Sequence, residues 1–180
     1  MSHFRICAII AVCLLAIEAG QLRAQTAAAK DPWAPLQFLV GAWTGEGSGA
    51  PGPSGTGGFT LSFDLDKQIL VRKNWAKYAP APGEKTGISH EDLMIIYPDS
   101  GRTAMRAIYF DNEGHVINYV ASFPARQSAA FESDAAQPGP RYRLTYELGP
   151  DGKLAIAFFI AAPGQPFKEY TRGIAHREKQ

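Results

Sequence analysis

Apolar and polar residues alternate along most of the chain after residue 41, with the period of two that is typical of half-buried β-strands. The clearest case is the stretch 59–65, in which Phe and Leu alternate with Thr, Ser and Asp. The pattern predicts ten strands, at 42–49, 59–65, 68–78, 90–97, 102–110, 115–123, 128–133, 141–148, 153–161 and 167–177. A short helix is expected before them, starting at Asp31-Pro32-Trp33 and ending before Gly41, because Asp is a favoured N-cap and Pro a favoured first helical residue.

Nearly every connection between the expected strands is short and contains Gly, Pro, Asp or Asn, the residues that favour hairpin turns. Parallel strands would need crossover helices, and no long helical period follows residue 41. A meander of this length closes on itself and so removes its edges. We therefore expect an all-β fold, a single up-and-down antiparallel β-barrel of about ten strands with a short N-terminal helix. A two-sheet sandwich is the alternative.

Residues 1–24 have the pattern of a signal peptide. Arg5 provides a positive charge, the stretch 6–17 is apolar but shorter than the roughly 20 residues of a membrane-spanning helix, and a cleavage site follows Ala24. The alternative is a buried N-terminal helix. The signal-peptide interpretation predicts a periplasmic or secreted protein with no stable membrane span after cleavage.

The mature chain would then consist of a linker at 25–32 and a barrel domain at 33–178. Both cysteines, Cys7 and Cys13, lie in the segment to be removed, which excludes disulfides, Cys-metal sites and Cys nucleophiles. The remaining chain has 16 basic and 16 acidic residues. A neutral balance excludes a nucleic-acid binder that depends on clustered Lys and Arg, so no nucleic-acid partner is expected.

A barrel of ten strands is wide enough to enclose a cavity unless large side chains fill it. Several aromatic residues are candidates for the inner face: Phe59, Phe63, Trp75, Tyr142, Tyr146 and Phe158. They either line a ligand pocket or fill the interior, and the sequence leaves both options open.

Two polar residues, Arg106 and Asn118, lie in otherwise apolar alternations of the strands expected at 102–110 and 115–123. If these alternations form the inner face, both side chains are buried and need partners, and Arg106 would recognise an anionic ligand. If Met105 and its alternates form the inner face instead, Arg106 lies in water.

The stretch 38–47, Phe-Leu-Val-Gly-Ala-Trp-Thr-Gly-Glu-Gly, is the most informative segment. A short helix followed by Gly-x-Trp resembles the calycin-type barrels, which include the lipocalins and fatty-acid-binding proteins. The longer Gly-x-Trp-x-Gly-x-Gly, with Gly41, Trp43 and Gly45, is similar to the nitrobindin-like ten-stranded barrels and to related bacterial proteins of unknown function. Gly41 would allow a sharp turn and Trp43 would close the barrel end. The resemblance implies a basic residue of the last strand over this Trp, Arg172 or Arg177.

Nitrobindin-like barrels bind haem through a His on a late strand, and the matching stretch here, 168–174, contains no His. Tyr170 lies near the corresponding position, and a phenolate can ligate haem iron, although this is a substitution rather than a match. The resemblance therefore implies a barrel that encloses a small apolar or amphipathic molecule, with anionic and haem-like ligands among the candidates.

The function expected from these observations is an exported, non-catalytic barrel that binds a small ligand. Its expected binding residues are Arg106, Asn118, Trp75, Tyr142, Tyr146 and Tyr170. One alternative is an isomerase- or hydrolase-like enzyme that uses tyrosines, Arg106 and His90 in the cavity. The other is a protein-interaction module with a filled core, in which Trp75 and Tyr78 form the contact patch. No metal site is expected, because the histidines of the mature chain are not paired at ligand spacing.

Overall fold

The computed structural model describes residues 31–52, 54–80, 82–133 and 139–179. The predicted signal peptide and the predicted linker up to residue 30 lie outside the described residues. Within the described part of the chain, no helix is long and apolar enough to cross a membrane.

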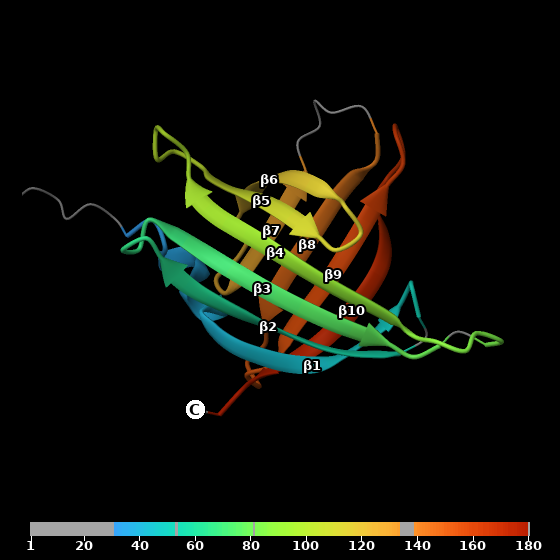
Figure 1. The fold of residues 1–180 in the computed structure, drawn as a ribbon. Helices are drawn as coiled ribbons and strands as arrows, with labels where there is room; N and C mark the ends of the chain where they lie inside the picture. The colour runs from blue at the N-terminus through green and yellow to red at the C-terminus, as the bar shows by residue number, and fades with distance from the viewer. Residues whose placement is uncertain (1–30, 53, 81, 134–138, 180) are drawn as a thin grey trace, which may run out of the picture. The chain divides into compact units, whose positions relative to one another are not determined.

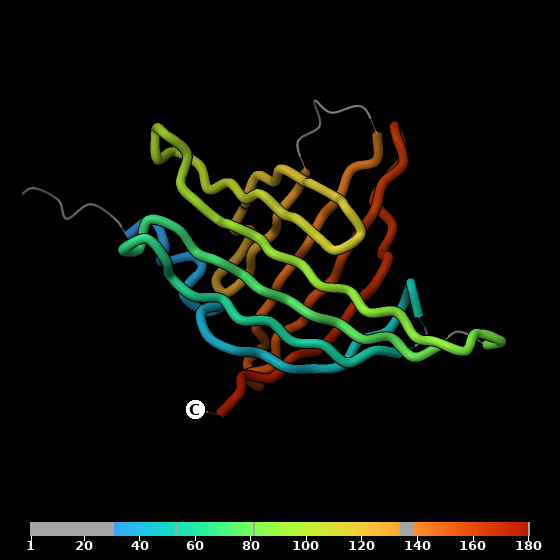
Figure 2. The backbone as a smooth tube through the Cα atoms, viewed as in Figure 1, coloured from blue at the N-terminus to red at the C-terminus, as the bar shows by residue number. Residues whose placement is uncertain are grey.

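Ten antiparallel strands form one closed barrel, in which each strand pairs with its neighbours in sequence and the last strand pairs with the first (Figure 1). The strands are β1 (Gly41–Gly49), β2 (Gly55–Asp64), β3 (Ile69–Tyr78), β4 (Ile88–Pro98), β5 (Met105–Asp111), β6 (Val116–Ser122), β7 (Ser128–Ser133), β8 (Arg141–Leu148), β9 (Leu154–Ala161) and β10 (Lys168–Arg177). The backbone trace shows the successive hairpins running up and down around the barrel (Figure 2). The predicted meander is confirmed, and the sandwich alternative is wrong.

The glycine-rich tract is the largest difference from the expected strand boundaries. We expected 49–58 to be a break, but β2 begins at Gly55 and its glycines pair with β1 and β3. Strand β1 also carries glycines, because its backbone lies very close to that of β10. A Cβ at Gly45 of β1 would lie 2.1 Å from the carbonyl oxygen of Ile174 in β10. These glycines therefore allow β1 to lie tightly between its neighbours.

Two turns also differ from the expectation. Leu65 was expected in a strand, but it starts a turn with φ of 47° and is 65% exposed. The fifth strand was expected from residue 102 and begins at Met105 instead. The carboxylate of Asp99 accepts hydrogen bonds from the backbone nitrogens of Thr103 (2.7 Å) and Ala104 (3.3 Å), which hold these residues in the turn.

A short 3₁₀-helix, η1 (Ala34–Leu39), covers one end of the barrel, which we call the closed end. Its N-cap is Trp33, with a proline in the first turn, and Asp31 accepts a hydrogen bond from the Trp33 backbone nitrogen at 3.0 Å. Asp31 therefore stabilises the residues just before the helix. We expected Asp31 to be the N-cap, and this expectation is wrong. Leu36 and Leu39 point into the core and are fully buried.

Trp43 closes this end of the barrel, as predicted. Its side chain is 1% exposed, and its Nε1 donates a hydrogen bond to the carbonyl oxygen of Leu39 at 2.9 Å. The guanidinium of Arg177 lies 4.4 Å from the Trp43 ring centroid and donates to the carbonyl oxygens of Phe38 and Val40. Arg177 thus covers the tryptophan. The expectation for Arg172 is wrong, because that side chain is exposed and pairs with Glu169 at 2.6 Å.

Gly41 occupies the sharp turn between η1 and β1. Its φ of +126° is a conformation that side-chain-bearing residues rarely adopt, and a Cβ here would lie 2.6 Å from the Arg177 guanidinium. The glycine therefore makes room for the arginine that covers Trp43.

Candidate functional site

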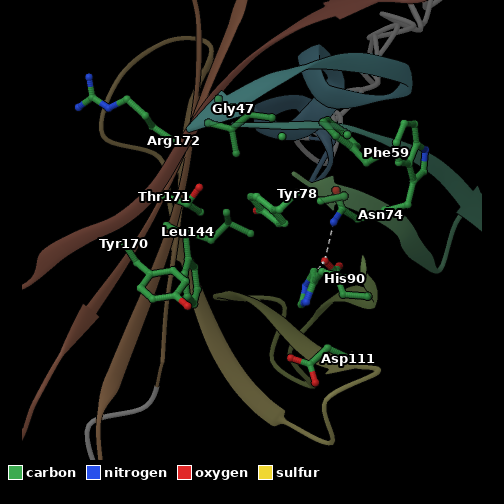
Figure 3. A pocket seen from close by; sticks show the side chains of 18 of the residues that line it. Gly47, Phe59, Asn74, Tyr78, His90, Asp111, Leu144, Tyr170, Thr171 and Arg172 are labelled. Carbon is green, nitrogen blue, oxygen red and sulfur yellow. Dashed lines mark hydrogen bonds and ion pairs between the residues drawn. The ribbon is translucent and has the colours of Figure 1, made fainter. Parts of the chain in front are cut away.

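A cavity of about 660 Å³ occupies the barrel interior (Figure 3). It extends to the end of the barrel where the β1–β2, β3–β4 and β5–β6 connections lie, because Pro51, Ile88 and Glu113 are among its lining residues. We call this the loop end. Residues of η1 do not line the cavity, so the interior is filled at the closed end and hollow toward the loop end.

One wall of the cavity is apolar and comes from β8, β9 and β10. Its side chains are Tyr142, Leu144, Ile156, Phe158, Ile160 and Tyr170. The rings of Tyr142 and Phe158 stack with centroids 6.0 Å apart, and Tyr170 packs edge-on against Phe158. Figure 3 shows Leu144 and Tyr170 on this side of the cavity.

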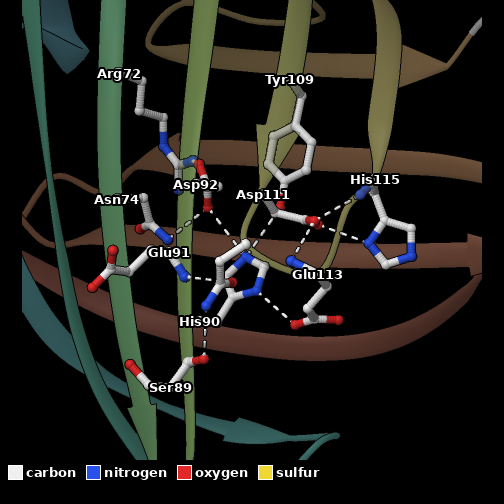
Figure 4. Close-up of polar contacts among 11 residues, drawn as sticks. Arg72, Asn74, Ser89, His90, Glu91, Asp92, Tyr109, Asp111, Glu113 and His115 are labelled. Carbon is white, nitrogen blue, oxygen red and sulfur yellow. Dashed lines mark hydrogen bonds and ion pairs between the residues drawn. The ribbon is translucent and has the colours of Figure 1, made fainter.

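The facing wall is polar and comes from β3, β4 and β5. Arg72 and Asn74 of β3, His90 and Asp92 of β4, and Tyr109 and Asp111 of β5 line the cavity there. Figure 4 shows the side chains of Arg72, Asn74, His90, Asp92 and Tyr109 joined by hydrogen bonds and ion pairs, and Asp111 bonded to the β5–β6 turn beside them. We call this set the polar wall.

Asp92 is the centre of the polar wall, and its side chain is only 3% exposed. It forms an ion pair with Arg72, accepts a hydrogen bond from Asn74 Nδ2 at 2.8 Å, and lies 3.4 Å from His90 Nε2. The Arg72 guanidinium also lies over the rings of Phe59 (5.3 Å) and Tyr146 (6.0 Å). Burial has the largest single effect and lowers the pKa of Arg72, but the charge of Asp92 together with smaller contributions from neighbouring tyrosines outweighs it, so the pKa is raised overall.

Both ring nitrogens of His90 form hydrogen bonds. Nδ1 lies 2.9 Å from Glu113 Oε1, and Nε2 lies 3.0 Å from the Tyr109 hydroxyl. The hydrogen-bonding carboxylate of Asp92, aided by Glu113, raises the pKa of His90 from 6.5 to about 9 in spite of partial burial. His90 is therefore an imidazolium at neutral pH, and both of its N–H groups donate.

Asp111 lies nearer the loop end and is fixed by the β5–β6 turn. Its carboxylate accepts hydrogen bonds from the backbone nitrogens of Glu113 (3.0 Å) and His115 (2.9 Å) and from His115 Nδ1 (2.8 Å). Burial would raise the pKa of Asp111, but these hydrogen bonds outweigh it and lower the pKa below its ordinary value. Asp111 is thus an ionised acceptor whose partners lie within the turn.

Three buried polar atoms have no hydrogen-bond partner among the described residues: Arg72 Nε, the Tyr119 hydroxyl and the Tyr146 hydroxyl. Each unsatisfied buried donor or acceptor costs about 1–3 kcal/mol, so such atoms usually face a bound molecule or an ordered water. Arg72 and Tyr119 line the cavity with other atoms, because the Arg72 Nε and the Tyr119 hydroxyl have less than 1 Å² of accessible surface each, and Tyr146 is not part of the lining.

The structure brings some of the predicted binding residues to the cavity. Tyr142 and Tyr170 line the cavity. Tyr146 does not line it and is buried against the guanidinium of Arg72. Trp75 is among the residues along the cavity, but its ring belongs to the outer face of β3, is 42% exposed, and lies over Gly58, where a Cβ would come within 3.2 Å of the indole Nε1. The expectation that Trp75 points inward is therefore wrong.

The two polar residues predicted for the interior are on the outer face as well. Arg106 and Asn118 are exposed, while Tyr109 and Tyr119, from the alternate positions of β5 and β6, are buried. The apolar and aromatic residues of the alternate positions pack inward, and this turns Arg106 and Asn118 outward. Arg106 therefore lies in water, as the second of the two predicted options stated.

Sequence reasoning missed the polar wall. Arg72 and Asn74 follow Leu70 at spacing two, and the alternate positions of the same strand include Lys73 and Lys77, which are exposed. Two lysines on one face of a strand indicate the solvent side, and this signal would have placed Arg72 inside.

The stretch 168–174 of the late strand offers a haem no His, and Tyr170 is the residue of this stretch that lines the cavity with a side chain able to ligate iron. Tyr170 is 39% exposed and packs edge-on against Phe158, and His90 is charged with both nitrogens engaged. Within the described residues, no three or more His, Cys, Asp or Glu side chains are grouped so that they could hold a metal ion.

A closed ten-stranded antiparallel barrel with a short helix at one end and a cavity inside defines this chain as a protein of calycin-like fold. Several solved structures share this fold, and two of them are described here. The chain is similar to Rv2717c from M. tuberculosis, with a TM-score of 0.60 and 16% identity over 82% of this chain and 98% of that one. It is also similar to the S-type phycobiliprotein lyase CPES from Guillardia theta, with a TM-score of 0.50 and 8% identity over 79% of this chain and 90% of that one.

No family model and no curated protein sequence matches the chain. At these levels of identity, the likeness to the two solved structures shows the fold alone.

Proposed function

We propose that this protein binds a small amphipathic molecule inside the barrel without transforming it. The observation that carries the proposal is the cavity of about 660 Å³ with an apolar wall on β8–β10 and a polar wall on β3–β5. Ligand sites of proteins occupy roughly 300–1,000 Å³ and combine an apolar lining with a few placed polar groups. The apolar body of the ligand would lie against Phe158 and its neighbours, with its polar atoms toward the polar wall.

The state of the titratable groups favours binding over catalysis. A general base must be free to accept a proton near the working pH, but His90 is already an imidazolium with both nitrogens engaged. Asp92 and Asp111 accept hydrogen bonds from several partners each. These side chains are held rigidly by their hydrogen bonds, which argues against an enzyme that uses one of them as a general base.

The hollow interior also argues against the interaction module with a filled core. The phycobiliprotein lyase shares the barrel, and this supports ligand binding as a use of the fold without indicating which ligand this chain takes. We further propose export of the protein, on the signal-peptide pattern of residues 1–24. N-terminal sequencing of the mature protein should find Gln25 first, and an intact N-terminus in the native host would contradict export.

Titration with the neutral fluorescent probe N-phenyl-1-naphthylamine tests the binding proposal, together with native mass spectrometry of the purified protein for a co-purified small molecule. The decisive pair of variants lies on β9, where Ile156 lines the cavity and Ala155 is exposed on the outer face. Ile156→Trp fills the cavity and should weaken probe binding by about 10-fold or more, as expected from losing a well-packed apolar contact. Ala155→Trp should bind like the wild type.

Two results would count against ligand binding in the barrel. One is the absence of any saturable probe signal and of any co-purified molecule. The other is equal probe binding by both variants, which would place the probe outside the cavity.

A further inference from the structure

We infer that the outer face of β4, β5 and β6 is a contact surface through which two copies of this chain associate about a two-fold axis. These three strands are neighbours in the barrel (Figure 1). Their inner residues, such as Tyr109 and Ile117, line the cavity, so the alternate residues face away from it. The inference is therefore independent of the proposed ligand binding.

Nine outward residues of these strands form the surface, which we call the outer patch. They pair across the strands in three rows, and from the loop end to the closed end these rows are Leu93–Phe110–Val116, Ile95–Ile108–Asn118 and Tyr97–Arg106–Val120. Only Arg106 and Asn118 among them are polar. Phe110, Val116 and Val120 are 39%, 61% and 37% exposed, so the outer patch presents large apolar side chains to solvent.

Other outer faces of the same barrel are polar. The outward residues of β2 are Thr56, Thr60, Ser62 and Asp64. Those of β8 are Arg141, Arg143, Thr145 and Glu147. Since single exposed apolar residues are common but an apolar area confined to adjacent strands is not, the outer patch has the character of a contact surface.

The two ends of the outer patch carry opposite charges. Glu91 is exposed and lies on β4 one outward position before Leu93, at the loop end, whereas Arg106 belongs to the row at the closed end. The charges are about 20 Å apart along the strands, because Arg106 pairs with Tyr97, six residues after Glu91. Neither side chain forms an ion pair within the part of the chain that the structure describes.

This arrangement of charge is complementary to itself when a second copy lies on it with its strands reversed. A two-fold axis that runs across the strands, between the Leu93 row and the Ile95 row, places the two apolar rows against each other. The same axis places Glu91 of each copy over the closed-end row of the other, where Arg106 lies. Two equivalent ion pairs then form together. A two-fold axis along the strands would instead bring like charges together, which is unfavourable.

The size of the outer patch indicates a reversible dimer. Three strands about 4.8 Å apart and about 20 Å long present roughly 300 Å² on each copy, which is less than the roughly 800 Å² per partner of a stable complex. We therefore expect monomer and dimer to exchange in an equilibrium that depends on protein concentration.

Analytical ultracentrifugation over a series of protein concentrations tests the inference. The wild type should approach twice the mass of one chain as the concentration rises. Phe110→Asp places a charge in the apolar rows and should weaken dimerisation by about 10-fold or more. Ile174→Asp is the matched control, because Ile174 is 45% exposed on β10, outside the outer patch, and this variant should sediment like the wild type.

Two results of this comparison would overturn the inference. One is a wild type that stays monomeric at every concentration, which would leave the outer patch to another occupant. The other is a dimer that Phe110→Asp and Ile174→Asp affect equally, which would place the interface elsewhere. Circular dichroism of both variants confirms that the barrel is intact in each comparison.

Charge reversal tests the two-fold arrangement itself. Arg106→Glu alone brings two negative charges together at each contact, and Glu91→Lys alone brings two positive charges together, so each should weaken dimerisation by about 10-fold. The variant that combines both changes restores opposite charges and should dimerise within about 3-fold of the wild type. A combined variant as weak as the single ones, or single variants without effect, would refute the reversed packing and with it the inference.

Discussion

The imidazolium of His90 should make the barrel less stable as the pH rises from about 6.5 to about 9. Its pKa in the folded protein is raised from 6.5 to about 9 by hydrogen bonding to Asp92 and Glu113. A group with a raised folded-state pKa contributes all of its stabilisation below its unfolded pKa. That contribution is lost as the pH passes through the folded-state value, so the loss is confined to this window.

The size of this loss in unfolding free energy follows from the raised pKa of His90 and from the exposure of the side chains involved. A tenfold change in proton affinity is about 1.4 kcal/mol, so a pKa of about 9 in place of 6.5 corresponds to at most about 3–4 kcal/mol. The His90 side chain is 22% exposed and that of its partner Glu113 is 51% exposed, so solvent screens part of the interaction. We expect about 1–2 kcal/mol to be lost across the window.

Urea unfolding of the wild type and of His90→Gln, measured at intervals from about pH 6 to about pH 10, tests this reasoning. Gln keeps a donor but does not titrate. The other side chains that face His90 are Asp92, Glu113 and Tyr109, and burial raises the pKa of Tyr109, so this phenol stays neutral in the range. Groups elsewhere are common to both chains, and their titration cancels in the difference.

The difference in unfolding free energy between the two proteins should therefore be largest near pH 6 and shrink toward pH 10. A difference that stays constant over the range would refute a perturbed His90. A difference that grows with pH would reverse the sign and show that His90 is stabilised in its neutral form.

Three further predictions concern the packing around the cavity and the closed end. Arg72→Met should cost about 3–5 kcal/mol in urea unfolding because it leaves Asp92 buried without its cation, and adding Asp92→Asn should recover most of this loss; a double variant no better than the single one would contradict it. Arg177→Met should cost about 1 kcal/mol through its contacts with Trp43, while the exposed Arg172→Met leaves the unfolding midpoint unchanged; equal midpoints would remove the role of Arg177. Trp43→Ala should cost about 3–5 kcal/mol, and a loss below about 1 kcal/mol would show that the closed end is not packed around it.

The order of the strands and their closure could be predicted from the sequence because the signals are local. Alternation with a period of two marks each strand, and short Gly, Pro, Asp and Asn connections force neighbours in sequence to pair. The ends of strands were less predictable. Gly55 lies in a tract that reads as a break, yet it extends β2, because the fit between backbones that favours glycine there involves residues distant in sequence.

Alternation alone does not predict the polar wall, because it shows two faces without saying which is inside. On β3 the exposed Lys73 and Lys77 mark the solvent side, whereas β5 is ambiguous. In β5 one face carries Arg106 and the other carries Tyr109, and both faces contain apolar residues. Tyr109 is inside because its ring packs edge-on against Tyr119 of the next strand. Such cross-strand packing depends on register, which becomes visible only in the folded barrel.

The inner faces of β3, β4 and β5 all change from apolar to polar along the barrel axis. Near the closed end they carry Leu70, Ile96 and Met105, which pack in the core, and toward the loop end the same faces carry the charged and hydrogen-bonding side chains of the polar wall. On β9, by contrast, the inner face stays apolar toward the loop end, with Phe158 lining the cavity.

Polarity is therefore distributed around the barrel as well as along it. A molecule that enters from the loop end meets polar groups on one side only, and it must turn its own polar atoms toward β3–β5 to avoid leaving them against the aromatic wall.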